Sequence, residues 1–318
     1  LSEYDRWVKD NPDQVFTAAR DALAAPGKLE LAQKLFEDFL RLHPTDPRSA
    51  EVKGHLGLIY GDASRWDAAE KMLREYVGAQ AEQQEKPANY AAAKFVLAQA
   101  SYQLSRTNKE RLNQAKQDLE QYLADHKEDA YVKYAQGFLG DVLRDMQKPA
   151  EAVAAYQSAL GLLTAPADAE RAKQISINLS HVRSKTGADG AGQAITELDA
   201  LIKQGKLSKP NEIADAYLMI GGNHIMLAEA AQDPAQKAAH YQSAAAAYDE
   251  GLKAAPEWPQ AGACRDSWAS CQTAHARLLA SGGKTEESLA LCDAVIAQSD
   301  KIPNKAFVND AQLIRGII

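Results

Sequence analysis

The chain has 318 residues, of which 36 are basic and 43 are acidic, so its formal net charge is −7. Hydrophobic residues make up 46% of it, which is enough for a folded core and excludes a mainly disordered chain. No apolar run approaches the roughly 20 residues that a membrane-spanning helix needs, and no basic cluster suits a phosphate backbone. We therefore expect a soluble protein with no membrane insertion and no nucleic-acid partner. Alanine supplies 60 residues, which favours an all-helical chain.

The chain begins Leu1-Ser2-Glu3 without an initiator Met. This start predicts a processed mature protein or an excised domain, located in the cytoplasm or the periplasm. The sequence alone leaves the compartment open.

One pattern recurs seven times along the chain. A small residue is followed four positions later by a second core-type residue, usually a large one, and three positions after that by a third, which places each trio on one face of a helix. The trios are Ala32/Phe36/Phe39, Ala69/Leu73/Tyr76, Ala115/Leu119/Tyr122, Ala152/Tyr156/Ala159, Ala194/Leu198/Leu201, Ala244/Tyr248/Gly251 and Ser288/Cys292/Val295. The small residue lets a neighbouring helix approach closely, so the pattern predicts seven packing helices.

A second apolar helix precedes most trios. In three units a small residue lies twelve positions before the trio, in the pairs Gly57/Ala69, Gly140/Ala152 and Ala276/Ser288. Twelve residues suit a helix end, a tight turn and a helix start, so each unit is predicted to be a helical hairpin. The dipeptides Asn11-Pro12, Asp46-Pro47 and Asp233-Pro234 each offer a capping side chain and a proline for the first helical position.

These units resemble tetratricopeptide repeats. The resemblance rests on Leu56-Gly57, Tyr60, Trp66, Ala69 and Leu73 in one unit, on Leu139-Gly140, Ala152, Tyr156, Ala159 and Leu160 in another, and on Ala244, Tyr248, Leu252 and Pro256 in a third. It covers residues 12 to 302. Successive trios are 37, 46, 37, 42, 50 and 44 residues apart, whereas the family repeats every ~34. Armadillo and HEAT repeats are the structural alternative.

The resemblance implies an all-α, right-handed superhelix of about seven hairpins plus a C-terminal helix. We expect residues 1–318 to form a single repeat array, with residues 184–192 as the segment best suited to a kink. Residues 303–318 are predicted to form the last helix. Its apolar Leu313, Ile314, Ile317 and Ile318 indicate that more protein follows or that a second copy associates through it.

The sequence shows no motif for catalysis, cofactor binding or metal binding. It lacks a glycine-rich phosphate loop, HExxH, CxxC and a nucleophile elbow. His224 lies near His240 on predicted helices, but a metal would need further ligands. Cys264, Cys271 and Cys292 are expected to be buried hydrophobes. We therefore predict no enzymatic activity, no cofactor and no metal.

The predicted binding surface lies on the first helices of the hairpins, one step beyond their core faces. Its candidates are Phe95, Gln99, Tyr102, Tyr134, Phe138, Asp141, Arg144, Leu218 and Ile225. Aromatic residues and Arg with a polar fringe suit a protein or peptide partner. The alternative is that Phe95, Tyr102 and Phe138 pack between units. The carboxylate clamp of the family is not implied, because Gly54, Leu58 and Phe138 occupy the corresponding positions.

The function implied by the resemblance is a non-catalytic scaffold that binds a protein or peptide in its concave groove. The alternative is a receptor for a short peptide or small ligand held inside the superhelix. The long insertions at 78–88 and 228–238 are further places where a partner would bind.

Overall fold

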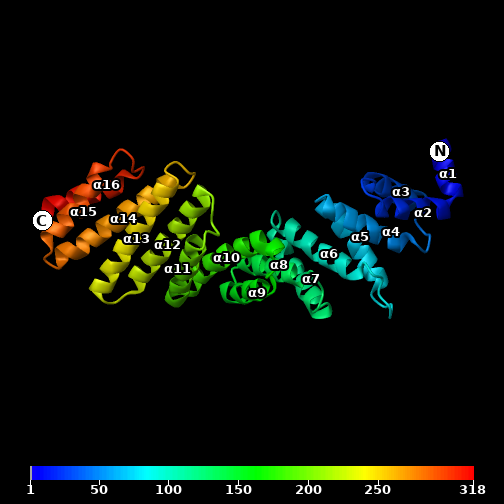
Figure 1. The fold of residues 1–318 in the computed structure, drawn as a ribbon, viewed down its shortest axis with the longest axis horizontal. Coiled ribbons are helices and arrows are strands. Elements are labelled where there is room, and N and C mark those ends of the chain that lie inside the picture. Colours follow the sequence, from blue (N-terminus) through cyan, green and yellow to red (C-terminus); the bar gives the residue numbers. More distant parts are fainter. Residues whose placement is uncertain (1) are drawn as a thin grey trace. The chain divides into compact units, whose positions relative to one another are not determined.

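Helices account for all the regular secondary structure of residues 2–318, the part that this computed structural model describes (Figure 1). Sixteen α-helices and three short 3-10 helices follow one another in that range, without a strand. This confirms the all-α prediction.

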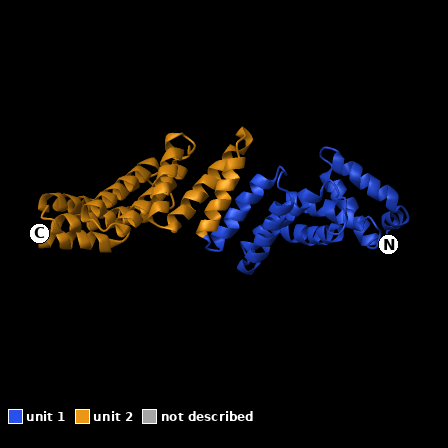
Figure 2. Cartoon of the chain, turned by 90° about the horizontal axis from the view of Figure 1, so that it is seen from below, with its two compact units in different colours: residues 1–148 blue, residues 149–318 orange. Residues whose placement is uncertain are grey.

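The chain divides into two compact units, residues 1–148 and residues 149–318 (Figure 2). The boundary lies between the predicted members of the fourth hairpin, α8 and α9. The helices of unit 1 are α1 (Glu3–Asp10), α2 (Pro12–Ala24), α3 (Leu29–Leu42), α4 (Ser49–Asp62), α5 (Trp66–Gln80), α6 (Tyr90–Ser105), η1 (Lys109–Arg111), α7 (Leu112–Asp125) and α8 (Val132–Asp145). The helices of unit 2 are α9 (Pro149–Leu162), η2 (Pro166–Asp168), α10 (Ala169–Arg183), η3 (Ser184–Thr186), α11 (Ala188–Lys203), α12 (Pro210–Ala230), α13 (Pro234–Ala254), α14 (Ala261–Ser281), α15 (Thr285–Ala297) and α16 (Lys305–Ile317).

The segment 184–192, which we expected to carry a kink, lies within unit 2. There η3 leads into α11 through Gly187, whose φ of 105° suits glycine. Both η3 and α10 pack against α11.

Consecutive helices pack as hairpins within each unit. The pairs are α2 with α3, α4 with α5, α6 with α7, α10 with α11, α12 with α13 and α14 with α15. In unit 1 the first helices also stack, α4 on α6 and α6 on α8. Outward side chains of α4, α6 and α8 therefore share one face of unit 1.

All seven predicted trios are buried. They lie on α3, α5, α7, α9, α11, α13 and α15, the second helices of the predicted hairpins. The largest fully buried side chains include Phe36, Leu73, Tyr122, Tyr156 and Leu198, which all belong to trios. The period of four and three therefore identifies the core correctly.

Small residues allow the two helices of a hairpin to touch. A Cβ atom built on Gly57 would lie 2.4 Å from Cγ of Leu73, and one built on Gly221 would lie 2.4 Å from Cε1 of Tyr248. Ser288 serves the same purpose on α15, where its hydroxyl donates a hydrogen bond of 2.8 Å to the carbonyl of Ala276.

The predicted caps are confirmed at one position and are wrong at two. Asp233 accepts hydrogen bonds from the amides of Ala235 and Gln236, and Pro234 begins α13. Pro12 begins α2, but the Asn11 amide donates back to the carbonyl of Trp7 instead of capping. Asp46 binds Arg48, and α4 begins only at Ser49.

The predicted C-terminal helix is present as α16. Val308, Ala311 and Ile314 are buried against α14 and α15, whereas Leu313, Ile317 and Ile318 are exposed. Ile314 thus belongs to the core of unit 2.

Two histidines meet in unit 2 where α12 packs on α13. The Nδ1 atoms of His224 and His240 lie 3.4 Å apart. Burial lowers the pKa of His224 below 6.5, and the neighbouring His240 lowers it further. His224 is therefore neutral at pH 7.

We expect adjacent glycines of α12 to respond oppositely to alanine. Gly221→Ala should lower the free energy of unfolding by about 1–3 kcal/mol, because the added methyl group would clash with the Tyr248 ring. This ring is only 2% exposed and has no space into which it can move. Gly222→Ala is the matched control, since a Cβ there meets no atom within 4 Å, and it should raise the free energy by about 0.5–1 kcal/mol. Urea unfolding measures both; equal effects would contradict the assigned register.

We also expect His224 to make unit 2 less stable in acid. Since its pKa is lowered in the folded state, the unfolded chain takes up the proton first, and stability present above about pH 6.5 is lost as the pH falls. Between about pH 7.5 and about pH 5.5 the Tm should fall, and it should fall less in His224→Asn. Identical falls in both proteins would show that His224 contributes nothing to this dependence.

Candidate functional site

Seven of the nine predicted binding residues lie together in unit 1. Phe95, Gln99 and Tyr102 are on α6, and the other four are on α8: Tyr134, Phe138, Asp141 and Arg144. Leu218 and Ile225 lie on α12 in unit 2, where both are partly buried against the core. These two residues therefore belong to unit 2, whereas the other seven belong to unit 1.

The aromatic members of this set pack α6 against α8. The Phe138 ring lies 6.0 Å from that of Phe95 and 5.6 Å from that of Tyr102, and Phe95 also stacks on Tyr131 at 4.8 Å. Phe95 and Tyr102 are only 7% exposed, and burial raises the pKa of Tyr102 to about 12. These two residues therefore pack between α6 and α8, in agreement with the alternative that they pack between units.

The polar members are also held by their own unit. Asp141 is 5% exposed, and Arg144 Nη1 lies 3.2 Å from its carboxylate. Arg144 also binds Asp145 at 3.0 Å. Gln99 and Tyr134 are half-buried. A partner reaching this surface would meet Gln99 and Tyr134 more readily than the buried aromatic residues.

A pocket that the sequence analysis did not predict lies elsewhere in unit 1, between the first two full hairpins. It has a volume of about 580 Å³, within the range of ligand sites in proteins. We call it the α4 pocket. It is lined by Arg20, Pro47, Arg48, Ala50, Glu51, His55, Tyr76, Gln80, Gln83, Pro87, Ala88 and Asn89. These residues come from α2, the turn before α4, α4 itself, α5 and the loop 81–89.

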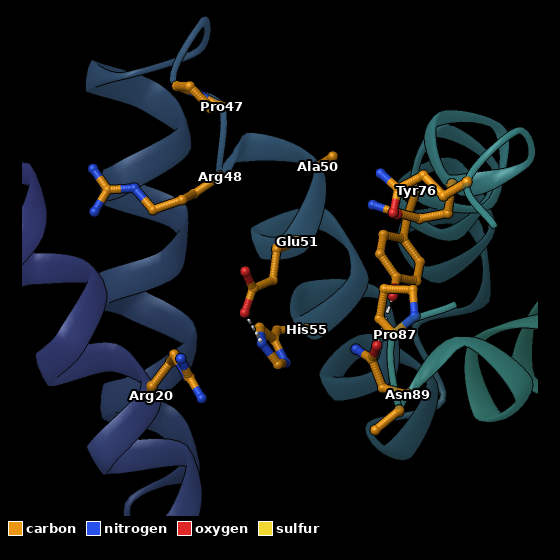
Figure 3. Close-up of a pocket in the computed structure, with 12 residues that line it drawn as sticks. Arg20, Pro47, Arg48, Ala50, Glu51, His55, Tyr76, Pro87 and Asn89 are labelled. Atoms are coloured by element: carbon orange, nitrogen blue, oxygen red, sulfur yellow. Dashed lines mark hydrogen bonds and ion pairs between the residues drawn. The ribbon is translucent and has the colours of Figure 1, made fainter. Parts of the chain in front are cut away.

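Glu51 and His55 form the floor of the α4 pocket. They are four residues apart on α4 and so face the same side, with His55 Nε2 3.5 Å from Glu51 Oε1 (Figure 3). The His55 ring stacks on Phe36 at 5.2 Å. Burial lowers the pKa of His55, Glu51 opposes this, and Arg20 adds to it. The imidazole is therefore neutral at pH 7.

Tyr76, Pro87 and Asn89 lie on the side of this pair opposite Arg20 (Figure 3). The Tyr76 hydroxyl donates a hydrogen bond of 2.6 Å to Oδ1 of Asn89, and burial raises the pKa of Tyr76 to about 12. Lys86 Nζ donates to the carbonyls of Gln80 and Ala81, both at 2.7 Å. These bonds attach the loop 81–89 to the end of α5 and fix the pocket wall.

Gln80 brings an unsatisfied acceptor to the wall. Gln80 is 7% exposed, and its Oε1 atom is buried without a hydrogen bond. Leaving a buried acceptor unpaired costs about 1–3 kcal/mol. Gln80 lines the cavity, so a ligand bound there would be able to supply the missing donor.

The two arginines of the pocket differ in availability. Arg48 is bound to Asp46 at 2.8 Å and to Asp13 at 2.7 Å, and its guanidinium stacks on Phe16 and Phe39. Arg20 is exposed and makes no ion pair with any residue of the range 2–318. Arg20 is therefore the cation that the pocket offers to a ligand.

The side chains that line the pocket are mainly amides, prolines and alanines, with two arginines, a tyrosine and the Glu51–His55 pair. The residues that line the pocket beside His55 include no Ser, Thr, Cys or Lys that would serve as a side-chain nucleophile. The cysteines are buried in unit 2, where burial raises the pKa of Cys264 and of Cys271 to about 12. Within the described chain, no three His, Cys, Asp or Glu side chains converge as metal ligands would.

A second hollow lies over α11 in unit 2, with a volume of about 620 Å³. Two of its three charged residues neutralise each other, since Arg183 Nη1 lies 2.7 Å from Glu197 Oε1, and the third is Asp189. The hollow is wide open to solvent, so it gives a ligand less enclosure than the α4 pocket.

None of the helices described in residues 2–318 is both long and apolar enough to cross a membrane.

The insertion at 78–88 is the one sequence signal that points to the α4 pocket. It contains Gln80, Gln83 and Pro87, and it corresponds closely to the loop 81–89. The contributions of α2 and α4 have no signal in the sequence, because Arg20, Glu51 and His55 are ordinary residues of helix surfaces.

Neither a protein-family model nor a curated protein sequence matches the chain. Among solved structures, the C-terminal part of a TPR repeat-containing protein from Cytophaga hutchinsonii is 12% identical, covers 96% of this chain and 98% of its own, and gives a TM-score of 0.54. RapI in its apo form is 10% identical over 98% of this chain and 81% of its own, with a TM-score of 0.49. A tetratricopeptide repeat protein from Parabacteroides merdae is 14% identical over 95% and 98%, with a TM-score of 0.46.

Only the first of these likenesses is strong enough to carry an argument, and at 12% identity it concerns the fold. It agrees with the buried trios and the paired helices described above. The chain therefore has the helical-hairpin fold of tetratricopeptide-repeat proteins.

Proposed function

We propose that the chain is a non-catalytic interaction scaffold that binds a protein or peptide partner through unit 1. The observation that carries this proposal is the α4 pocket, where a cavity of about 580 Å³ contains a buried acceptor, Gln80 Oε1, with no hydrogen-bond donor. A repeat fold of this kind presents side chains from successive first helices on one face.

The stacking of α4, α6 and α8 supports this proposal. Because these helices pack side by side, the α4 pocket and the half-buried Gln99 and Tyr134 belong to the same series of first helices in unit 1. We propose the surface of α6 and α8 around Gln99, Tyr134, Phe138 and Arg144 as a second contact, supported from within by the buried Phe95, Tyr102 and Asp141. Leu218 and Ile225 would be a separate contact on unit 2.

The second candidate is a receptor for a short peptide or small ligand. The size of the α4 pocket favours it, because the cavity suits a ligand much smaller than a protein. A receptor of this kind gains thermal stability when the isolated ligand binds, whereas a scaffold gains it only with the partner protein.

We expect a tryptophan at Ala88 to abolish partner capture. Ala88 is exposed and lines the pocket, so Ala88→Trp places a bulky ring in the cavity without disturbing the core. Ala81→Trp is the matched control, since Ala81 is exposed on the same loop outside the lining. Proteins retained by the wild type from a native extract, quantified by mass spectrometry, should fall about tenfold or more with Ala88→Trp alone.

Gln99→Ala and Tyr134→Ala test the second contact in the same assay, with the Tm of each variant as the measure of folding. If Ala88→Trp captures the same proteins in the same amounts as Ala81→Trp, the α4 pocket is not the partner site. Loss of capture only in the Gln99 and Tyr134 variants would move the site to α6 and α8.

A further inference from the structure

The geometry points to a specific ligand for the α4 pocket: a short, extended peptide segment carrying an acidic side chain, held by Arg20 and by the side-chain amides at the end of α5. This inference rests on the function proposed above and names the chemistry of the partner at that site.

Arg20 provides the charge selection. The other cation of the lining, Arg48, is already neutralised by Asp46 and Asp13, and Glu51 is turned toward His55 (Figure 3). Arg20 is left as the one lining cation without a carboxylate among the described residues. A guanidinium binds a carboxylate through paired N–H donors, so an acidic side chain fits this side of the pocket.

The unpaired Oε1 atom of Gln80, a lining residue, favours a ligand that supplies a hydrogen-bond donor. Inorganic phosphate and simple dicarboxylates present mainly acceptors to Arg20 and supply no N–H to Gln80. A peptide backbone supplies an N–H and a C=O at every residue. Gln83 and Asn89 line the pocket together with Gln80. Side-chain amides both donate and accept hydrogen bonds, so they suit the alternating N–H and C=O groups of a peptide backbone.

The remaining lining favours an apolar neighbour of the acidic residue. Pro47, Ala50, Pro87 and Ala88 offer no side-chain hydrogen bonds, and the hydroxyl of Tyr76 is already used by Asn89. A nucleic acid is a poor fit, because one available cation cannot neutralise a run of phosphates. The pocket therefore selects a peptide in which an acidic residue adjoins an apolar one.

The test uses a library of tetrapeptides that are N-acetylated and C-amidated, so that their only charges are on side chains. The full chain is dialysed against the library, and retained peptides are quantified by mass spectrometry. We expect peptides with Asp or Glu beside an apolar residue to be retained about tenfold better than their Asn or Gln counterparts. Phosphate and succinate at the same concentration should not displace them.

The variants separate the two parts of the pocket. Arg20→Gln should still retain peptides but lose the preference for acidic ones, while Arg106→Gln, at an exposed arginine outside the lining, should behave as wild type. Gln80→Leu should reduce retention of all peptides by about tenfold with a Tm at or above that of the wild type, because leucine removes the unpaired acceptor without leaving a void. Ala88→Trp gives the background.

Retention no greater than that of Ala88→Trp overturns the inference, and so does an acid preference that survives Arg20→Gln. The function proposed above fails differently. If partner capture depends on the pocket but acidic tetrapeptides gain nothing, the scaffold stands and this ligand class is wrong. If acidic tetrapeptides bind through Arg20 but Ala88→Trp leaves partner capture intact, the pocket takes this ligand and the scaffold site lies elsewhere.

Discussion

Three hairpins, α4–α5, α12–α13 and α14–α15, each depend on one close contact between their two helices. A small residue on one helix lets the partner approach: Gly57 meets Leu73, Gly221 meets Tyr248, and Ser288 bonds the backbone at Ala276. The large side chain then fills the space that the small residue leaves. Because a hairpin in such a fold contacts only its neighbours, a lost contact cannot be compensated by distant parts of the core. The constant spacing of four and three residues within each trio is therefore the constraint that the helical repeat must obey.

This constraint explains why the core could be predicted and the caps could not. Burial imposes a period on the sequence, and every trio that shows the period is buried. A helix N-cap leaves no comparable period in the sequence, because a side chain that is able to cap a helix can also form hydrogen bonds with other groups nearby. Asn11 bonds the carbonyl of Trp7 at 2.8 Å, and Asp46 is taken by Arg48, which lowers the pKa of Asp46 to about 2. Only Asp233 caps as predicted.

The unequal spacing of the trios has two physical origins. The spacings of 50 and 44 residues in unit 2 arise because α12, α13 and α14 are each 21 residues long. The spacing of 46 in unit 1 arises largely from the loop 81–89, which inserts between α5 and α6 and forms a wall of the α4 pocket. An insertion that lengthens a helix extends the core, whereas one that forms a loop creates a new surface.

The predicted binding residues and the α4 pocket differ in what a sequence can reveal. Phe95, Tyr102 and Phe138 attract attention because they are large, and the same property makes them useful for packing α6 on α8. The pocket instead was identified by a hydrogen bond that is missing, because no donor of the described residues lies near Gln80 Oε1. A missing hydrogen bond can be recognised only from the three-dimensional structure. The loop is held by Lys86 and by the Tyr76–Asn89 bond, so the orphan acceptor persists although it costs stability. If the pocket binds the ligand proposed above, a wall held by these bonds before binding would lower the entropy lost when the ligand binds.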